Sequence, residues 1–101
     1  MEKRIKKEIA KALCSRGGAL EDIIQAYYSE NKGKEKGVIV RRYYFERRGY
    51  RATMRELRRC GYYCERSQFY RLKDEVLSDI AMRACYEHLI CPYSDKTSLN
   101  E

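Results

Sequence analysis

The sequence predicts an all-α fold, a small helical bundle of about five helices that contains a helix-turn-helix. Charged residues make up 37% of the 101 residues and only one proline is present, a composition that favours helix over strand. Apolar residues recur at helical spacing through most of the chain. A chain of this length is expected to form a single domain, 1–101, with a modest core. Its expected parts are an N-terminal helical part (1–31), a helix-turn-helix part (38–91) and a polar tail (92–101).

Two amphipathic helices are predicted in the N-terminal part. The first covers residues 3–14 and ends before Gly17 and Gly18, and the second covers residues 19–30. The segment "SENKGKEKG" that follows is rich in Gly, Asn and Lys and is predicted to be a loop. The apolar residues that share one face in the two helices are Ile5, Ile9 and Leu13, then Leu20, Ile23, Ile24 and Tyr27.

The stretch "VIVRRYYFERRGY" is predicted to form a third helix that ends at Gly49. Its β-branched and aromatic residues make a strand the competing interpretation. A period of two would place Arg41 on the same face as Ile39 and Tyr43, whereas a helix buries Ile39, Val40 and Tyr43 together. The spacing therefore favours the helix.

A capping box is predicted at Thr53, because Glu56 follows three residues later. A short helix over about 54–60 would then present Met54, Leu57 and Cys60 to the core. Gly61 follows where a left-handed residue commonly ends a helix.

After the turn "GYYC", in which Tyr62 is expected in the core and Tyr63 outside, a long helix is predicted over about 65–90. Pro92 fixes its end. Its predicted inner face consists of Phe69, Leu72, Val76, Leu77, Ile80, Ala81 and Ala84.

The net charge of +7 is concentrated in residues 41 to 73, which carry eleven basic and three acidic residues. This local balance of +8 leaves −1 for the rest of the chain. Dense arginine interspersed with aromatic residues is typical of a surface that meets phosphates. A solvated charged face is the alternative.

A capped helix, a glycine turn and a basic helix in this order are the layout of a helix-turn-helix, whose second helix reads bases in the major groove. Arginine can bond guanine and glutamine can bond adenine, each with two hydrogen bonds. The predicted base-reading residues are Arg66, Ser67, Gln68 and Arg71. The predicted phosphate-binding residues are Arg51, Thr53, Arg55, Arg58, Arg59 and Lys73.

Residues 38 to 81, "VIVRRYYFERRGYRATMRELRRCGYYCERSQFYRLKDEVLSDIA", resemble the C-terminal part of phage and prophage late-gene transcriptional activators of the RinA and ArpU type. The matching elements are "VIVRRYYF", "TMREL" and "ERSQFYRLKDEVLSDIA". The fold of that family is similar to region four of bacterial sigma factors. The resemblance implies binding of double-stranded DNA near a phage promoter, with contact to RNA polymerase. The turn "CGYYC" is bulkier than is usual in the family.

Five cysteines without a regular framework indicate reduced thiols or metal ligands. Cys60 and Cys64, together with Cys85, His88 and Cys91, are candidate zinc ligands. Their spacing is not that of a known finger, so buried thiols are the default interpretation and no cofactor is expected. Catalytic motifs are absent from the sequence, which predicts a protein that is not an enzyme.

Alternatives to a DNA-binding regulator stay open. One is a small phage-encoded interaction module that inhibits a host nucleic-acid-binding protein, since tyrosine and arginine also dominate interface hot spots. Another is single-stranded RNA binding through the doublets Tyr27-Tyr28, Tyr43-Tyr44 and Tyr62-Tyr63. The N-terminus lacks the apolar core of a signal peptide or membrane span, so we expect a cytoplasmic protein of a bacterial host cell. A homodimer would suit a regulator that reads two half-sites.

Overall fold

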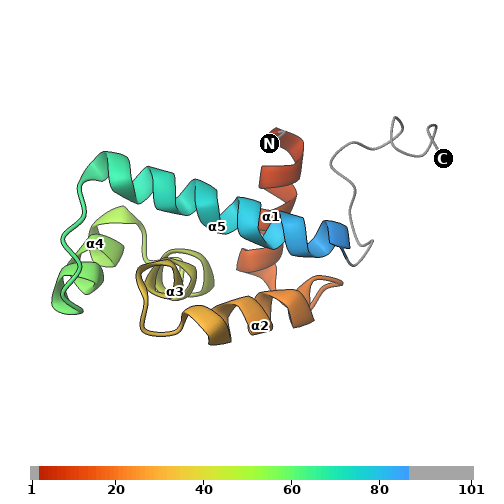
Figure 1. Cartoon of the computed structure of the whole chain (residues 1–101), viewed down its shortest axis with the longest axis horizontal. Coiled ribbons are helices and arrows are strands. Elements are labelled where there is room, and N and C mark those ends of the chain that lie inside the picture. The colour runs from red at the N-terminus through yellow and green to blue at the C-terminus, as the bar shows by residue number, and fades with distance from the viewer. Residues whose placement is uncertain (1–2, 87–101) are drawn as a thin grey trace.

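The computed structural model describes residues 3–86, and these form an all-α bundle without strands (Figure 1). The helices are α1 (Lys3–Ser15), α2 (Glu21–Asn31), α3 (Glu35–Val38), η1 (Ile39–Phe45), α4 (Tyr50–Arg59) and α5 (Arg66–Tyr86). The helix α3 runs directly into η1, which is a π-helix. The predicted fold class is therefore confirmed.

The long helix α5 crosses the molecule and packs against α1, α2, α3 and η1 (Figure 1). The predicted inner face of α5 is buried at all seven positions, from Phe69 to Ala84. Ile5, Ile9 and Leu13 of α1 are buried as well. Apolar residues from each of these helices join in one core cluster. Within residues 3–86, no helix has both the length and the apolar character needed to cross a bilayer.

The predicted loop "SENKGKEKG" is much shorter than expected. Helix α2 continues to Asn31 and α3 already begins at Glu35, so only residues 32–34 separate the two helices. Gly37 is buried inside α3, where its backbone lies against the end of α2. The glycine that indicated a loop is there because a side chain would not fit.

The third predicted helix exists, but its register differs from the prediction. Ile39 and Val40 are buried as expected, whereas Tyr44 is buried in place of Tyr43. The N–H of Glu46 donates to the carbonyl of Arg41, five residues earlier, at 2.9 Å. Because the π-helix has a wider turn than the α-helix, its inner face repeats at five residues rather than four.

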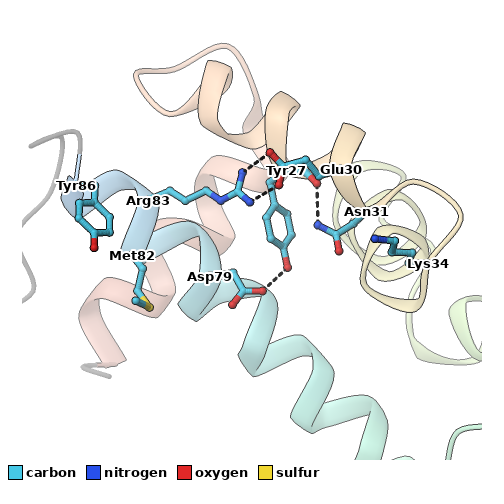
Figure 2. Close-up of a pocket in the computed structure, with 8 residues that line it drawn as sticks. All are labelled: Tyr27, Glu30, Asn31, Lys34, Asp79, Met82, Arg83 and Tyr86. Carbon is cyan, nitrogen blue, oxygen red and sulfur yellow. Dashed lines mark hydrogen bonds and ion pairs between the residues drawn. The ribbon is translucent and has the colours of Figure 1, made fainter.

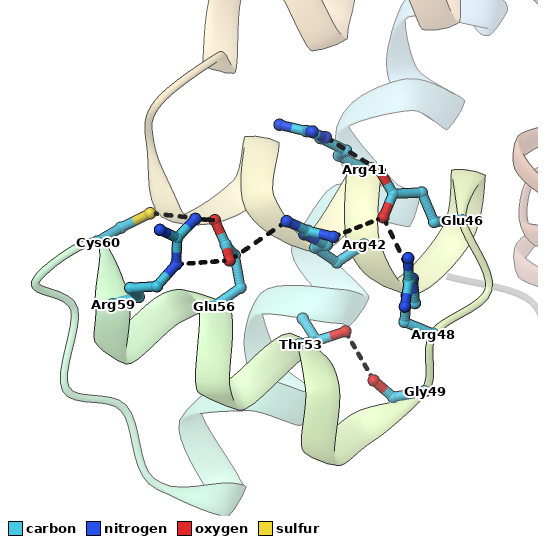
Figure 3. A network of polar contacts seen from close by, with 9 residues as sticks. All are labelled: Arg41, Arg42, Glu46, Arg48, Gly49, Thr53, Glu56, Arg59 and Cys60. Carbon is cyan, nitrogen blue, oxygen red and sulfur yellow. Dashed lines mark hydrogen bonds and ion pairs between the residues drawn. The ribbon is translucent and has the colours of Figure 1, made fainter.

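The predicted capping box at Thr53 is wrong. Helix α4 begins at Tyr50, after Gly49 with φ of 89°, so Thr53 lies inside the helix and is fully buried. Its hydroxyl donates to the carbonyl of Gly49 at 2.7 Å (Figure 3). Of the predicted inner face only Leu57 is buried, since Met54 is half-buried and Cys60 exposed.

The end of α4 matches the prediction for Gly61, which has φ of 92°. The N–H of Gly61 donates to the carbonyl of Arg58 at 3.0 Å, and the N–H of Tyr62 donates to that of Leu57 at 2.9 Å. These two bonds form a Schellman motif. Tyr62 then bonds the carbonyl of Gly33 through its hydroxyl at 2.8 Å, while Tyr63 is 80% exposed, as predicted.

Residues 87–101 lie outside the described part of the chain. The predicted end of the long helix at Pro92, the polar tail, and the candidate ligands His88 and Cys91 all fall there.

Candidate nucleic-acid interface

Three arginines form a line on the outer face of α4. Arg51, Arg55 and Arg58 are exposed and follow the spacing i, i+4, i+7, which places them within about 60° of one another around the helix. The buried residues Thr53 and Leu57 lie on the opposite face. No ion pair or hydrogen bond joins these three guanidinium groups to another side chain in residues 3–86. We call them the α4 arginine stripe.

Other arginines of the basic block are neutralised by two glutamates (Figure 3). Glu46 pairs with Arg41, Arg42 and Arg48 at 3.0, 2.9 and 3.6 Å. Glu56 pairs with Arg42 at 3.3 Å and receives two hydrogen bonds from Arg59, at 3.1 and 2.9 Å.

Arg59 differs from the other predicted phosphate-binding arginines, because it is bound to a carboxylate. The Arg59 hydrogen bonds hold the pKa of Glu56 below its ordinary value. An arginine held by a carboxylate in this way would have to leave its partner to bind a phosphate. Arg51, Arg55 and Arg58 keep their exposed charge without a carboxylate partner within residues 3–86, as does Arg66 at the start of α5.

Two further predicted phosphate-binding residues, Thr53 and Lys73, are not free side chains on the surface. Thr53 is 0% exposed, so its hydroxyl serves the fold rather than a ligand. Lys73 is half-buried, and its ammonium donates to the hydroxyl of Tyr43 at 3.1 Å. Its nitrogen also lies 4.3 Å from the centre of the Tyr43 ring. The ammonium of Lys73 is therefore already bound to Tyr43 and is not free to contact a phosphate.

The predicted base-reading residues Arg66, Ser67, Gln68 and Arg71 are all exposed on the first two turns of α5. Six residues, 60–65, connect α4 to α5, more than the three or four of a typical helix-turn-helix. Arg71 pairs with Glu75 one turn further on, at 3.2 Å.

Gln68 has a structural role that the sequence did not indicate. Its side-chain oxygen accepts a hydrogen bond from the backbone N–H of Glu65 at 3.0 Å. Glu65 and Gln68 are the N-cap and N3 positions of α5, so this contact is the returning half of a capping box. A bidentate contact with adenine would use the same oxygen, so Gln68 would have to give up this bond to read a base.

An aromatic cluster joins the first turns of α4 and α5. Tyr50 packs edge-on against Phe69, with ring centres 4.9 Å apart, and lies parallel to Tyr70 at 6.0 Å. Tyr43 also packs edge-on against Phe69, with ring centres 5.6 Å apart. The guanidinium of Arg66 lies 5.3 Å from the centre of the Tyr50 ring. Neither Tyr50 nor Tyr70 was predicted as a site residue, although Tyr70 follows Arg66 by four positions on a helix.

The charge of α5 changes sign beyond its second turn. Asp74 binds Lys6 of α1 at 3.0 Å, and Asp79 binds Lys36 of α3 at the same distance. Glu75 lies 3.3 Å from the same ammonium. The basic residues of α5 thus lie mainly in its first two turns, and the carboxylates that follow are paired with lysines of α1 and α3.

At the far end of α5, a cavity of about 430 Å³ lies between this helix and α2 (Figure 2). Tyr27 donates from its hydroxyl to Asp79 at 2.6 Å, and Asn31 donates to the carbonyl of Tyr27 at 2.9 Å. Burial and the bond to Asp79 raise the pKa of Tyr27 above its ordinary value. Glu30 pairs with Arg83 across the same cavity.

The tyrosine doublets, considered above as surfaces for the alternative of RNA stacking, are mostly packed within the protein. Tyr27 and Tyr44 are buried and Tyr62 is held by Gly33. Tyr28 packs against Phe45, with ring centres 5.5 Å apart. Of the three doublets, only Tyr63 is largely exposed.

The candidate zinc ligands Cys60 and Cys64 are separated from Cys85 by the length of α5. Cys60 and Cys64 precede this helix and Cys85 lies in its last turn, about 28 Å further along at 1.5 Å per residue. One zinc ion cannot bind thiolates that far apart. Cys60 instead lies 3.7 Å from a Glu56 oxygen, and Cys64 lies 3.9 Å from the Met54 sulfur. Within residues 3–86, no three potential metal-ligand side chains gather at one place.

Comparisons with protein-family models, with curated proteins and with solved structures returned no match. The resemblance to RinA and ArpU type activators therefore rests on the residues of this chain alone, and it stays a prediction.

Proposed function

We propose that this protein is a sequence-specific regulator of transcription that binds double-stranded DNA through α4 and the first two turns of α5. In this proposal α4 lies along the phosphate backbone and the N-terminal end of α5 enters the major groove, as in a helix-turn-helix. The α4 arginine stripe binds phosphates. Arg66 and Ser67 face the base edges, and Arg71 joins them by leaving Glu75.

The observation that carries the proposal is the contrast between paired and unpaired arginines. Four arginines of the basic block are satisfied by Glu46 and Glu56, whereas the α4 arginine stripe meets no carboxylate within residues 3–86. Three aligned cations repel one another at rest, and a row of anions removes that repulsion.

The length of the stripe also suits a DNA backbone. Arg51 and Arg58 are seven residues apart, which is about 10 Å along α4. A single strand of B-DNA carries a phosphate about every 3.4 Å of the duplex axis, and neighbouring phosphates are farther apart along the winding backbone itself. The stripe therefore spans more than one phosphate of a strand, and the long arginine side chains extend that reach.

The proposed biological setting follows the family resemblance. A regulator of this type would act in the cytoplasm of a bacterial host, at a phage or prophage promoter, with RNA polymerase as a second partner. Two copies bound to two half-sites would double the phosphate contacts and raise the affinity.

The test is a salt titration of binding to duplex DNA, measured by fluorescence anisotropy. The triple variant Arg51→Gln, Arg55→Gln, Arg58→Gln is expected to reduce the slope of log affinity against log salt by about 0.9 per contact, or about 2.7 in all. A matched control removes three exposed lysines that follow one another at four-residue intervals on α1, namely Lys3→Gln, Lys7→Gln and Lys11→Gln.

The control variant loses the same formal charge but should keep the wild-type slope within about 0.5, because α1 lies away from α4 in Figure 1. Equal slopes for the two triple variants would reduce DNA binding to a non-specific effect of net charge. Absence of duplex binding, together with a host protein that is retained after nuclease treatment of a lysate, would favour the interaction module instead.

A further inference from the structure

Tyr70 is an exposed aromatic ring inside a cationic surface. It is 47% exposed on the second turn of α5, four residues after Arg66 and one before Arg71. The ammonium of Lys73 lies 5.2 Å from the centre of its ring. Within residues 3–86 the hydroxyl of Tyr70 makes no hydrogen bond.

The ring is held in one orientation by its neighbours. Tyr50 lies parallel to it, with an interplanar angle of 4° and ring centres 6.0 Å apart. Phe69 meets it edge-on at 5.4 Å. A ring held in this way loses little conformational entropy when a ligand binds, which is a property of the aromatic anchors of binding surfaces.

We propose that Tyr70 reads a thymine, by contact between its ring and the 5-methyl group that thymine presents in the major groove. This inference rests on the proposed binding of duplex DNA. The surrounding cations bring α5 to the phosphates. A phosphate can accept a hydrogen bond from the Tyr70 hydroxyl, but it makes no apolar contact with the ring. On the base edges of the major groove, the thymine methyl group is the apolar feature that distinguishes one base pair from the others.

The position of Tyr70 on α5 supports this role. Arg66 and Tyr70 are four residues apart, so they lie one turn from each other on the same face of α5, near its N-terminal end. The next exposed carboxylate on α5, Asp74, is one turn further and is bound to Lys6. Tyr70 is therefore the last side chain of this row before the acidic part of the helix.

The experiment begins with selection of duplexes bound by the wild-type protein from a random library. Each thymine of the selected site is then replaced by deoxyuridine, which removes the methyl group and keeps every hydrogen-bonding atom. At one position we expect about a fourfold loss of affinity, the value of one buried methyl group. That loss should persist in Tyr70→Phe, which keeps the ring, and disappear in Tyr70→Ala.

Tyr86→Ala is the matched control, because Tyr86 is an 83% exposed tyrosine at the opposite end of α5. It should keep the deoxyuridine effect. Should Tyr70→Ala fail to fold, NMR of the wild-type complex gives the answer directly. The methyl protons of the contacted thymine should shift upfield, because the ring current of Tyr70 shields protons above its face, and Tyr86→Ala should leave that shift unchanged.

A selected site without thymine, a deoxyuridine effect of equal size in wild type and Tyr70→Ala, or thymine methyl signals that do not shift would each overturn the role of Tyr70. None of these results affects the proposed binding of duplex DNA. Failure of the wild-type protein to bind any duplex would instead remove the proposed function, and this inference with it.

Discussion

Replacement of Gly37 by alanine is expected to destabilise the protein by a steric mechanism. Gly37 is buried in α3, close to the last residues of α2. A Cβ atom at this position would lie 2.0 Å from the carbonyl oxygen of Asn31, 2.7 Å from its carbonyl carbon and 3.2 Å from the Cα of Lys32. All three are backbone atoms, so the contact cannot be relieved by rotation of a side chain.

The size of the effect follows from two opposing contributions. A shift of about 1 Å between α2 and α3 would disturb the packing of Ile39 and Val40, and overpacking of a core typically costs about 1 to 3 kcal/mol. Alanine is a better helix former than glycine by about 0.5 to 1 kcal/mol. The steric contribution is the larger, and we expect a net loss of about 1 to 2 kcal/mol.

Urea denaturation followed by far-ultraviolet circular dichroism measures this change. For a domain of this size the expected midpoint of Gly37→Ala is about 1 M lower in urea than that of the wild type. Gly18→Ala is the matched control, because no atom lies within 4 Å of its Cβ position and its φ is not in the left-handed region. Equal midpoints for the two variants would refute the steric argument.

Two further predictions concern hydrogen bonds and pH. Tyr27→Phe removes the hydroxyl that donates to Asp79, and urea titrations should show a free energy of unfolding lower by about 1 to 2 kcal/mol. Tyr28→Phe is the control and should match the wild type, because the Tyr28 hydroxyl makes no hydrogen bond within residues 3–86. Arg16 lowers the pKa of Glu21 from 4.5 to about 2, so the stability that this pair contributes is present above pH 4.5 and is lost as the pH falls through about 2. Glu21→Gln should therefore be less stable than the wild type at neutral pH, by up to about 1 kcal/mol, and the difference should vanish only below about pH 2. A difference independent of pH would contradict this assignment.

Features encoded by neighbouring residues were predicted well. The apolar spacing of α1 and α5 indicated their buried faces, because residues three and four apart share one side of an α-helix wherever that helix lies. Gly61 was predicted in the left-handed conformation because helix termination depends on a few adjacent backbone groups.

Predictions that needed a distant partner were less successful. The sequence could not reveal that the carbonyl of Asn31 requires glycine at position 37. The π-helix that buries Tyr44 instead of Tyr43 was equally hidden, because its wide turn has no distinct residue pattern. Thr53 matched a capping pattern that also occurs inside helices.

The candidate interface shows the same division. Composition and order along the chain established that the protein is helical, that its positive charge is concentrated in residues 41 to 73, and that a glycine turn separates two basic segments. Only the tertiary structure decided which arginines are neutralised by Glu46 and Glu56 and which remain exposed, and only it brought Tyr50 against Tyr70. The physical reason is range: helix periodicity and capping act over four residues or fewer, whereas ion pairs and ring contacts form between any side chains that the packing of helices brings together.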